Sequence, residues 1–250
     1  MTLSYEASWA HFLSLYPPAL IELLGGALIQ YAGVLIGAAA ATYIKPSLRP
    51  STAKTLPLAL FNITLGAFAH LLCLLALSQR TQKPLSTVSL TTMDPSFPQI
   101  GPMLAVFAQG FFLFDVYFYT VHAILHKEPL YRYFHSWHHG VKDKTPTAAY
   151  YNHPVEHVFV HMVGSYWIPV FAGAHVLSFF AAGLYYAVSA QVVHSGLYMP
   201  FMNHDGHDID LGKNVGAFGM LDLCLGSFMS RGEVTEWERK WTSKVSKRVE

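Results

Sequence analysis

Long apolar runs alternate with polar stretches through the first half of the chain. Pro18–Ile44 contains one charged residue, Glu22, and Leu56–Ser78 contains none. A third run, Gly101–His126, is apolar except for Asp115 and the two histidines near its end. A helix of about 20 apolar residues crosses a hydrocarbon core of about 30 Å. The pattern therefore predicts three membrane-spanning helices.

The second half contains a longer apolar segment, Val158–Val193, which has the length of two helices. Pro169 and Gly173 predict a break near its middle. The segment forms either two spans or a hairpin that enters and leaves the membrane on the same side. Between the apolar runs, we expect a loop over Gln79–Pro98 and a polar region over Lys127–Asn152.

The overall composition also indicates a membrane environment. Of the 250 residues, 52% are hydrophobic and 12% are charged, whereas a soluble domain usually has about 25% charged residues. The formal net charge of +1 gives no reason to expect nucleic acid as a partner. The two cysteines lie in apolar stretches, which excludes a disulfide framework and a cysteine-rich zinc site. We expect an all-α, polytopic integral membrane helical bundle.

Basic residues predict how the bundle is oriented. Segments 45–54, 127–144 and 213–248 contain 14 of the 16 lysines and arginines, whereas Arg80 and Lys83 lie in the loop after the second apolar run. Lysine and arginine are enriched in the cytoplasmic loops of membrane proteins. We therefore expect the three basic segments on the cytosolic side and the N-terminus on the opposite side. This orientation requires the long segment of the second half to return to its starting side.

Twelve of the 14 histidines fall within 86 residues, in clusters whose spacings suit a shared metal. Imidazole is the commonest protein ligand of transition metals. His122 and His126 stand at i and i+4 and share one face of a helix. His135, His138 and His139 stand at i, i+3 and i+4 and also share a face. The two clusters predict metal binding.

Asp115 lies seven residues before His122, two turns earlier on the same helix face. A carboxylate inside a membrane helix is costly unless it has a partner. We favour a position behind the metal, where Asp115 accepts a hydrogen bond from the second ring nitrogen of a ligating histidine. The alternative is that Asp115 caps a neighbouring helix.

The remaining histidines divide into a ligand candidate and structural residues. His194 ends a long apolar run, where a helix is expected to emerge near the clusters, and we favour a ligand role for it. His153 precedes a proline suited to the first turn of a helix, so a structural role for His153 and His157 is expected at least as much as ligation. His161 and His175 lie in apolar sequence and are expected to be core or interface residues.

The segment from His204 offers donors at i, i+3 and i+4, the last being the carboxylate of Asp208. One tetrahedral zinc uses four ligands at most, so eight nitrogens with Asp208 as an oxygen donor suit two metal ions. Iron is favoured over zinc because an apolar substrate has no carbonyl or phosphate group to polarise, whereas iron can activate O₂ against C–H bonds. The eight nitrogen ligand candidates, which are also the catalytic candidates, are His122, His126, His135, His138, His139, His194, His204 and His207.

These motifs resemble those of the fatty acid hydroxylase / sterol desaturase superfamily of membrane non-haem di-iron enzymes. The resemblance covers about Asp115 to Ser227, and the His-Pro-x-Glu and His-Ser-Gly motifs are closest to C4-methylsterol oxidases. The matching residues are Asp115, Tyr119, His122-x3-His126, Leu130-Tyr131-x2-Phe134-His135-x2-His138-His139, His153-Pro154-x-Glu156, His194-Ser195-Gly196, Pro200, His204-Asp205-x-His207, Asn214-x-Gly216, Leu221-Asp222 and Leu225-Gly226-Ser227.

The resemblance implies an endoplasmic reticulum enzyme whose histidine boxes hold two iron ions on the cytosolic side. Such an enzyme uses O₂ and electrons from NAD(P)H, commonly relayed by cytochrome b5, to hydroxylate or desaturate a lipid. The fold is then a helical membrane bundle with a cytosolic histidine-rich di-metal site. Its regions are an N-terminal transmembrane region at 1–100, a fatty acid hydroxylase-like catalytic domain at 101–230 and a basic C-terminal tail at 231–250.

The expected partners follow from the same resemblance. They are membrane lipid, an electron-transfer protein and a hydrophobic small-molecule substrate, which is a sterol, a fatty acyl chain, or a specialised terpenoid or polyketide. Hydroxylation, desaturation and oxidative rearrangement all stay open. We expect aromatic side chains to line the substrate pocket, although the same side chains would also suit a lipid-facing surface. The candidates are Phe111, Phe114, Phe118, Tyr166 and Trp167.

Two positions depart from the family pattern. The last histidine box of the family usually ends in two adjacent histidines, and here the second is Asp208; the first box often has an arginine where this chain has Ala123. Asp208 either ligates iron as a carboxylate or marks a lost ligand. The alternative function is therefore a degenerate, non-catalytic relative, or one with altered chemistry. A metal transporter ranks third, because the first two apolar runs contain almost none of the polar residues that transport requires at the membrane midplane.

The predicted orientation can be tested with engineered glycosylation acceptors. An acceptor site introduced near Ser86 is expected to be glycosylated, because the loop that contains it lies on the side opposite the cytosol. An acceptor near Lys142 is expected to stay unmodified. A gel-shift assay that is sensitive to glycosidase reads out both sites, and the opposite result would reverse the orientation.

Overall fold

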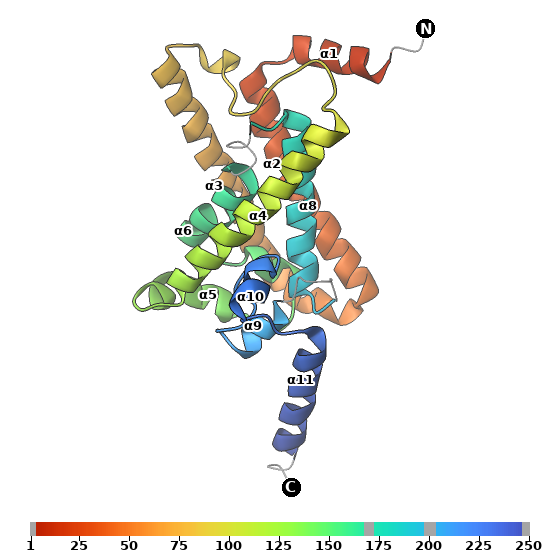
Figure 1. Ribbon diagram of the computed structural model, residues 1–250, viewed down its shortest axis with the longest axis vertical. Helices are drawn as coiled ribbons and strands as arrows, with labels where there is room; N and C mark the ends of the chain where they lie inside the picture. Colours follow the sequence, from red (N-terminus) through yellow and green to blue (C-terminus); the bar gives the residue numbers. More distant parts are fainter. Residues whose placement is uncertain (1–3, 168–172, 198–203, 247–250) are drawn as a thin grey trace.

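Four long helices form the bundle, and short helices and loops close its two ends (Figure 1). The computed structural model describes residues 4–167, 173–197 and 204–246. Each long helix has the length and apolar composition needed to cross a membrane. The described residues form no β-strand, so the predicted all-α membrane bundle is confirmed. The long helices are α2 (Pro18–Ile44), α3 (Arg49–Thr81), α4 (Ile100–Leu125) and α8 (Val176–His194).

Shorter elements occupy the two ends of the bundle. One end carries α1 (Tyr5–Leu15) and the loop with η2 (Leu85–Thr87), and η5 (His157–Trp167) runs within the bundle. The opposite end carries η1 (Pro46–Leu48), η3 (Tyr131–His135), α5 (Ser136–His139), η4 (Pro146–Tyr150), α6 (Pro154–Glu156), α9 (Asp205–Ile209), α10 (Met220–Leu225) and α11 (Arg231–Ser246).

The first three apolar runs became α2, α3 and α4, and only α3 differs clearly from its predicted run. It begins seven residues before Leu56 and continues into polar sequence. The hydroxyls of Thr52 and Thr55 are buried there and lie 3.1 and 2.5 Å from those of Thr145 and Thr147. Because these hydroxyls find partners inside the protein, the helix extends beyond the apolar sequence that predicted it.

The segment after residue 157 leaves the end of the bundle that carries α5 and α9, called here the site end, and returns to it. At its start, the ring of His157 packs on Tyr150 of η4, 5.2 Å away. In its middle, His175 caps α8 and contacts the carbonyl of Asp94 (3.1 Å), which also accepts a hydrogen bond from Trp9 of α1 at the opposite end. At its end, His194 packs on His138. The return that the basic residues required is therefore present. Pro169, near the predicted break, lies outside the described residues.

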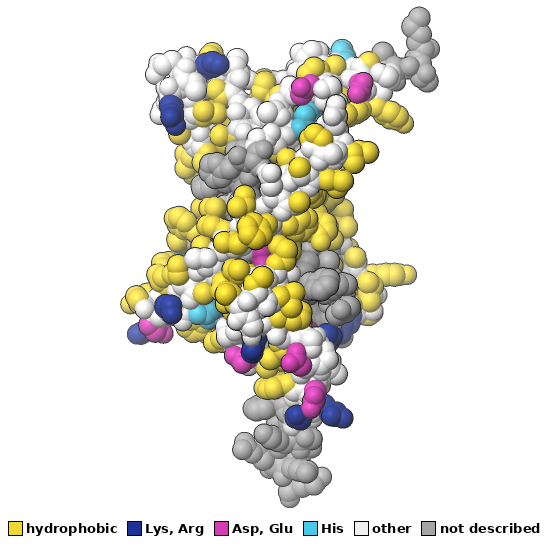
Figure 2. Space-filling model, in the orientation of Figure 1, with side chains coloured by type: hydrophobic (Ala, Val, Ile, Leu, Met, Phe, Trp, Pro, Cys, Tyr) yellow, Lys and Arg dark blue, Asp and Glu magenta, His cyan; other side chains and the backbone are white. Residues whose placement is uncertain are grey.

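The surface of the bundle is apolar around its middle and charged mainly toward its ends (Figure 2). Helix α4 contributes strongly to this apolar surface, and Ile100, Leu104 and Phe112 are among its exposed side chains. In water such a surface would favour aggregation, whereas hydrocarbon solvates it without cost. The distribution of side chains therefore supports a membrane setting for all four long helices.

Helices α2 and α8 pack closely because small residues face each other between them. A Cβ atom at Gly33 would lie 2.4 Å from the Cβ of Ala187, a distance that real side chains do not adopt. Lipid tails are as apolar as leucine, so membrane helices associate through close packing of small residues. The glycines of the first apolar run thus bring α2 against α8.

Glu22 connects α2, α3 and the η2 loop at the end of the bundle far from the histidines. Its carboxylate is fully buried and lies 2.8 Å from Nε2 of His70 on α3. It also accepts hydrogen bonds from the amides of Leu90 (2.9 Å) and Thr91 (2.8 Å) and from the hydroxyls of Ser89 and Thr91. A buried carboxylate with this many donors stays ionised without a large cost. This contact therefore fixes the distal end of the bundle.

Glu22→Ala is expected to destabilise the protein by about 3 kcal/mol or more, because it removes one partner of a buried, hydrogen-bonded pair. Glu22→Gln keeps one acceptor oxygen and is expected to have a smaller effect. Unfolding in a titration of sodium dodecyl sulfate measures the difference. Glu6→Ala, at an exposed position of α1, is the matched control. Equal stability of Glu22→Ala and Glu6→Ala would show that the buried contact does not stabilise the bundle.

Candidate metal centre

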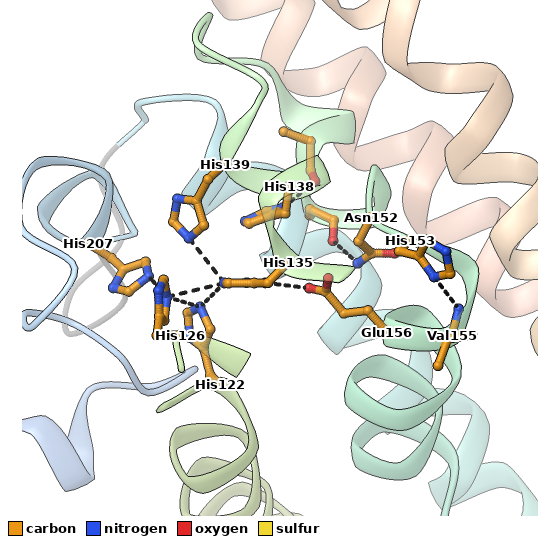
Figure 3. A network of polar contacts seen from close by, with 12 residues as sticks. His122, His126, His135, His138, His139, Asn152, His153, Val155, Glu156 and His207 are labelled. Atoms are coloured by element: carbon orange, nitrogen blue, oxygen red, sulfur yellow. Dashed lines mark hydrogen bonds and ion pairs between the residues drawn. The ribbon is translucent and has the colours of Figure 1, made fainter. Parts of the chain in front are cut away.

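All eight histidines named as ligand candidates lie at the same end of the bundle, and they come from separate elements. His122 and His126 close α4, and His194 is the last residue of α8. Elements η3 and α5 supply three more, His135, His138 and His139, and the α9 segment supplies His204 and His207. Figure 3 shows six of these rings, with several turned toward a common point.

Five of the eight form one group, called here the five-histidine group. Each offers one ring nitrogen, and these nitrogens lie within 4.8 Å of one another. Three Nε2–Nε2 distances are short: His122 to His135 is 3.0 Å, His126 to His207 is 2.8 Å and His135 to His139 is 3.0 Å. The members are His122, His126, His135, His139 and His207.

The other three, His138, His194 and His204, form a second group, the three-histidine group, with the same limit of 4.8 Å between ring nitrogens. Nε2 of His138 lies 3.2 Å from Nε2 of His204. Nε2 of His194 is buried and has no hydrogen-bond partner in the described part of the chain. The two groups are adjacent, since the ring centroids of His204 and His207 are 5.1 Å apart.

Backbone carbonyls contact Nδ1 in four of these rings, and this nitrogen is called here the outer nitrogen. Nδ1 of His122 lies 2.7 Å from the carbonyl of Val215, and Nδ1 of His207 lies 2.9 Å from that of Lys213. His138 and His194 make the same contact, with the carbonyls of Ala148 (3.1 Å) and Ala190 (2.8 Å). A carbonyl oxygen only accepts, so each Nδ1 must carry the proton and each Nε2 must present a lone pair.

Glu156 holds the outer nitrogen of His135 in the same way, with 2.8 Å between its carboxylate and Nδ1 (Figure 3). Burial raises the pKa of Glu156 to about 7. A positive charge near His135 would act in the opposite direction and favour the carboxylate form of Glu156. A carboxylate behind a ligating imidazole orients the ring and makes it more basic. Sequence analysis missed this pair, although the His-Pro-x-Glu motif contains the residue.

The donor set fits a metal ion. When Glu156 is ionised, His122 and His135 both present an Nε2 lone pair, and no proton joins the two nitrogens across their 3.0 Å separation. Two nitrogens bound to one metal at about 2.1 Å and at right angles are about 3.0 Å apart. Burial also lowers the pKa of His126 and His135 to about 4 and that of His138 to about 3, so these rings are neutral at pH 7, as ligation requires.

Asp115 has a different role from the favoured prediction. Its carboxylate accepts hydrogen bonds from the amides of Phe218 (2.6 Å) and Leu221 (2.7 Å), at the start of α10, whereas the outer nitrogen of His122 meets a backbone carbonyl. The prediction that Asp115 bonds a ligating imidazole was therefore wrong, and the capping alternative describes it. The seven-residue spacing placed Asp115 on the face of His122 but could not show that a distant segment covers that face.

Asp222 completes this arrangement from the covering segment itself. It is fully buried and accepts hydrogen bonds from the amides of Val215 (2.9 Å) and Gly216 (2.7 Å) and from the hydroxyl of Ser227 (2.6 Å). A Cβ at Gly216 would lie 2.8 Å from the carboxylate of Asp222 and 2.9 Å from that of Asp115, so only glycine fits between them. The two carboxylates thus fix the segment whose Val215 carbonyl orients His122.

The remaining histidines lie outside the two groups. His153 caps α6 by accepting a hydrogen bond from the amide of Val155 (3.2 Å), so its structural role is confirmed. His157 is buried and packs on Tyr150, also as a structural residue. His175 caps α8, which is more specific than the core or interface role expected. His161 lines a cavity described below.

Asp208 lies beside both groups but joins neither. Its carboxylate is 3.9 Å from Nε2 of His204 and 3.8 Å from the outer Nδ1 of His139, and its side chain is 51% exposed. Both distances exceed those of a hydrogen bond. The eight imidazoles therefore come together without an oxygen ligand from this position.

An apolar cleft opens beside the three-histidine group. Two of the predicted aromatics, Phe114 and Phe118, line it, whereas Phe111 packs edge-on against Tyr186 and Phe218. The side chains of Tyr166 and Trp167 lie outside what the structure describes. The lining residues are Phe114, Phe118, Tyr150, His161, Tyr186, Ser189, Ala190, Val193, His194, His204, Gly216, Ala217 and Phe218.

Known proteins resemble the part of the chain that builds this site. The fatty acid hydroxylase family model matches residues 107–226. Fatty acid hydroxylase ahd1 of Mycosarcoma maydis is 30% identical over 213 residues, which cover 80% of this chain and 50% of that protein. Fatty acid hydroxylase domain-containing protein 2 of Macaca fascicularis is 29% identical over 140 residues, which cover 53% of this chain and 40% of that protein.

C-4 methylsterol oxidase of Candida albicans is 31% identical over 116 residues, which cover 44% of this chain and 37% of that protein. The chain spans half or less of the length of these three relatives. No solved structure matches the chain.

Glu156→Ala is expected to lower the affinity for ferrous ion about 10- to 100-fold, because His135 loses the carboxylate that orients its ring. Competition with a chelator of known affinity measures the change. Glu236→Ala, at an exposed position of α11, is the matched control and should leave the affinity unchanged. If both variants bind iron as the wild type does, Glu156 does not support a ligand.

Proposed function

Residues 107–226 form a fatty acid hydroxylase domain, which places the chain in the fatty acid hydroxylase superfamily, and we propose that the protein is a membrane-bound non-haem di-iron oxidoreductase. It uses O₂ to hydroxylate or desaturate a hydrophobic, lipid-like substrate. The names of its relatives support oxidation of a lipid; they are a fatty acid hydroxylase, a fatty acid hydroxylase domain-containing protein and a C-4 methylsterol oxidase.

The observation that carries the proposal is the convergence of eight imidazoles in two adjacent groups of five and three. One metal ion does not use eight nitrogen ligands, whereas two ions do and keep positions open. We propose that each group holds one iron ion, with all eight histidines as ligands. Bound iron would supply activation of O₂. This chemistry is favoured over zinc-type hydrolysis because the apolar cleft beside the three-histidine group suits a hydrocarbon part of a lipid, which has no polar bond to hydrolyse.

The protein positions the lipid for this reaction and excludes water from it. The cleft reaches His194 and His204, so a lipid bound there lies against the three-histidine group. Phe114, Phe118 and Phe218 form apolar walls that exclude water from that end. The carbonyls behind four of the rings hold a proton on Nδ1, which keeps the Nε2 lone pair of each of these four rings available for a metal.

We further propose that the site faces the cytosol of the endoplasmic reticulum and takes electrons from NAD(P)H through cytochrome b5 or its reductase. The basic segments lie at the site end of the bundle, which agrees with a cytosolic orientation under the positive-inside rule. Lys144 and Arg231 at this end both pair with Asp205, so α11 is fixed beside the site.

The alternative, a non-catalytic relative, depended on Asp208 and Ala123. Both histidine groups form without a ligand from position 208, and the outer nitrogen of His122 is held by Val215 rather than by anything near position 123. The eight imidazoles therefore come together despite the two departures from the family pattern, which supports the catalytic proposal.

Purified protein reconstituted with ferrous ion is expected to hold close to two iron ions per chain. His138→Ala should reduce the iron content and abolish product formation, because the three-histidine group loses a ligand. Metal analysis and lipid profiling of expressing cells measure both effects. His11→Ala, at an exposed position of α1, is the matched control. Turnover by metal-free protein would overturn the proposal.

A further inference from the structure

One of the two tyrosines that line the cleft has a hydroxyl that the fold does not use. Tyr186 of α8 is 5% exposed and lines the cleft. Its hydroxyl is buried and has no hydrogen-bond partner in the described part of the chain. The other cleft tyrosine differs, because the hydroxyl of Tyr150 donates to the side-chain carbonyl of Gln30 at 2.9 Å. Only one of the two tyrosine hydroxyls therefore lacks a protein partner.

A buried hydroxyl without a partner is costly, and a phenylalanine would keep the same ring packing without that cost. The ring of Tyr186 packs on Phe111, Phe114 and Phe218, with centroids 5.3–5.7 Å away. The neighbouring helix also leaves room for the hydroxyl, since a Cβ at Gly110 would lie 3.1 Å from its oxygen. A hydroxyl that is accommodated but not satisfied points to a partner that arrives with a ligand.

The position of Tyr186 relative to the histidines indicates how a ligand would lie in the cleft. Tyr186 and His194 lie on the same helix, eight residues apart, and both line the cleft. Eight residues of an α-helix rise about 12 Å. A molecule that contacts both side chains therefore has one end at Tyr186 and extends along α8 to His194. The walls between these ends include Phe114, Phe118 and Val193 and are mainly apolar.

We propose that Tyr186 is a specificity-determining residue that hydrogen-bonds a hydroxyl or carbonyl oxygen of the substrate. The substrate class is then a lipid whose oxygen-bearing group lies at the Tyr186 end of the cleft, away from the carbon that reacts at the three-histidine group. The binding role of Tyr186 stands on the cleft alone, whereas the position of the reacting carbon rests on the proposed function. In that function, the contact selects which carbon lies against the three-histidine group.

The binding role can be measured without turnover. Metal-free protein in lipid nanodiscs is dialysed against radiolabelled 1-dodecanol or dodecane, with protein-free nanodiscs as the reference. The wild type is expected to bind the alcohol more tightly than the alkane. Tyr186→Phe should weaken alcohol binding about tenfold, which corresponds to about 1.4 kcal/mol, and leave alkane binding unchanged. Tyr185→Phe, which alters a tyrosine outside the cleft lining, should bind both probes as the wild type does.

The second test analyses the oxidation products formed by the iron-loaded protein. The wild type is expected to oxidise 1-dodecanol at one position or two adjacent positions far from its hydroxyl, and Tyr186→Phe should spread oxidation over several positions. Equal loss of alcohol and alkane binding in Tyr186→Phe, or no loss of either, would overturn the role of Tyr186 even if the enzyme oxidises lipids. Selective alcohol binding that depends on Tyr186, without turnover of any lipid, would overturn the proposed function and leave the binding role standing.

Discussion

A carbonyl oxygen accepts hydrogen bonds and never donates them, and the candidate metal centre depends on this asymmetry. Four of its eight histidines meet a backbone carbonyl at Nδ1. The proton of each ring is thereby fixed on the outer side, and the inner nitrogen is left as a lone pair. Without these contacts the rings could exchange tautomers and bond one another, and the cluster would satisfy itself without a metal. The outer contacts therefore turn a histidine-rich cluster into a set of ligands.

The source of these carbonyls explains why so much of the chain is needed. Two of them belong to Lys213 and Val215, in a segment that side chains hold in place rather than regular secondary structure. Asp115 fixes the far end of that segment and Asp222 fixes its near end, and Gly216 lies between the two carboxylates. Buried carboxylates are stable here because backbone amides surround them. The metal centre and the α4–α10 contact are therefore parts of a single structure.

Sequence analysis predicted the features that depend on local spacing. Apolar length gave the bounds of α2 and nearly those of α4. The i, i+3, i+4 spacings identified seven of the eight histidines that the fold brings together, and the end of an apolar run identified His194. Sequence analysis could not predict features that depend on contacts between distant segments. The pairing of Glu22 with His70 and that of Glu156 with His135 join different elements, and neither has a local pattern. The favoured prediction for Asp115 was wrong for the same reason, because the partners of its carboxylate are amides more than 100 residues away. The division into regions at 1–100, 101–230 and 231–250 and the cytosolic orientation stay predictions.

The order of these parts along the chain has a consequence for biosynthesis. His122 and His126 enter the membrane with α4, long before the ribosome has made the carbonyls and histidines of residues 204–215 that complete their surroundings. Until then the early imidazoles are free to rotate and to take up protons from the water near them. Loading of the proposed iron ions would thus follow the synthesis of residues 204–215. A ribosome that stalls before this point releases a protein whose membrane helices are inserted but whose histidines lack their outer supports.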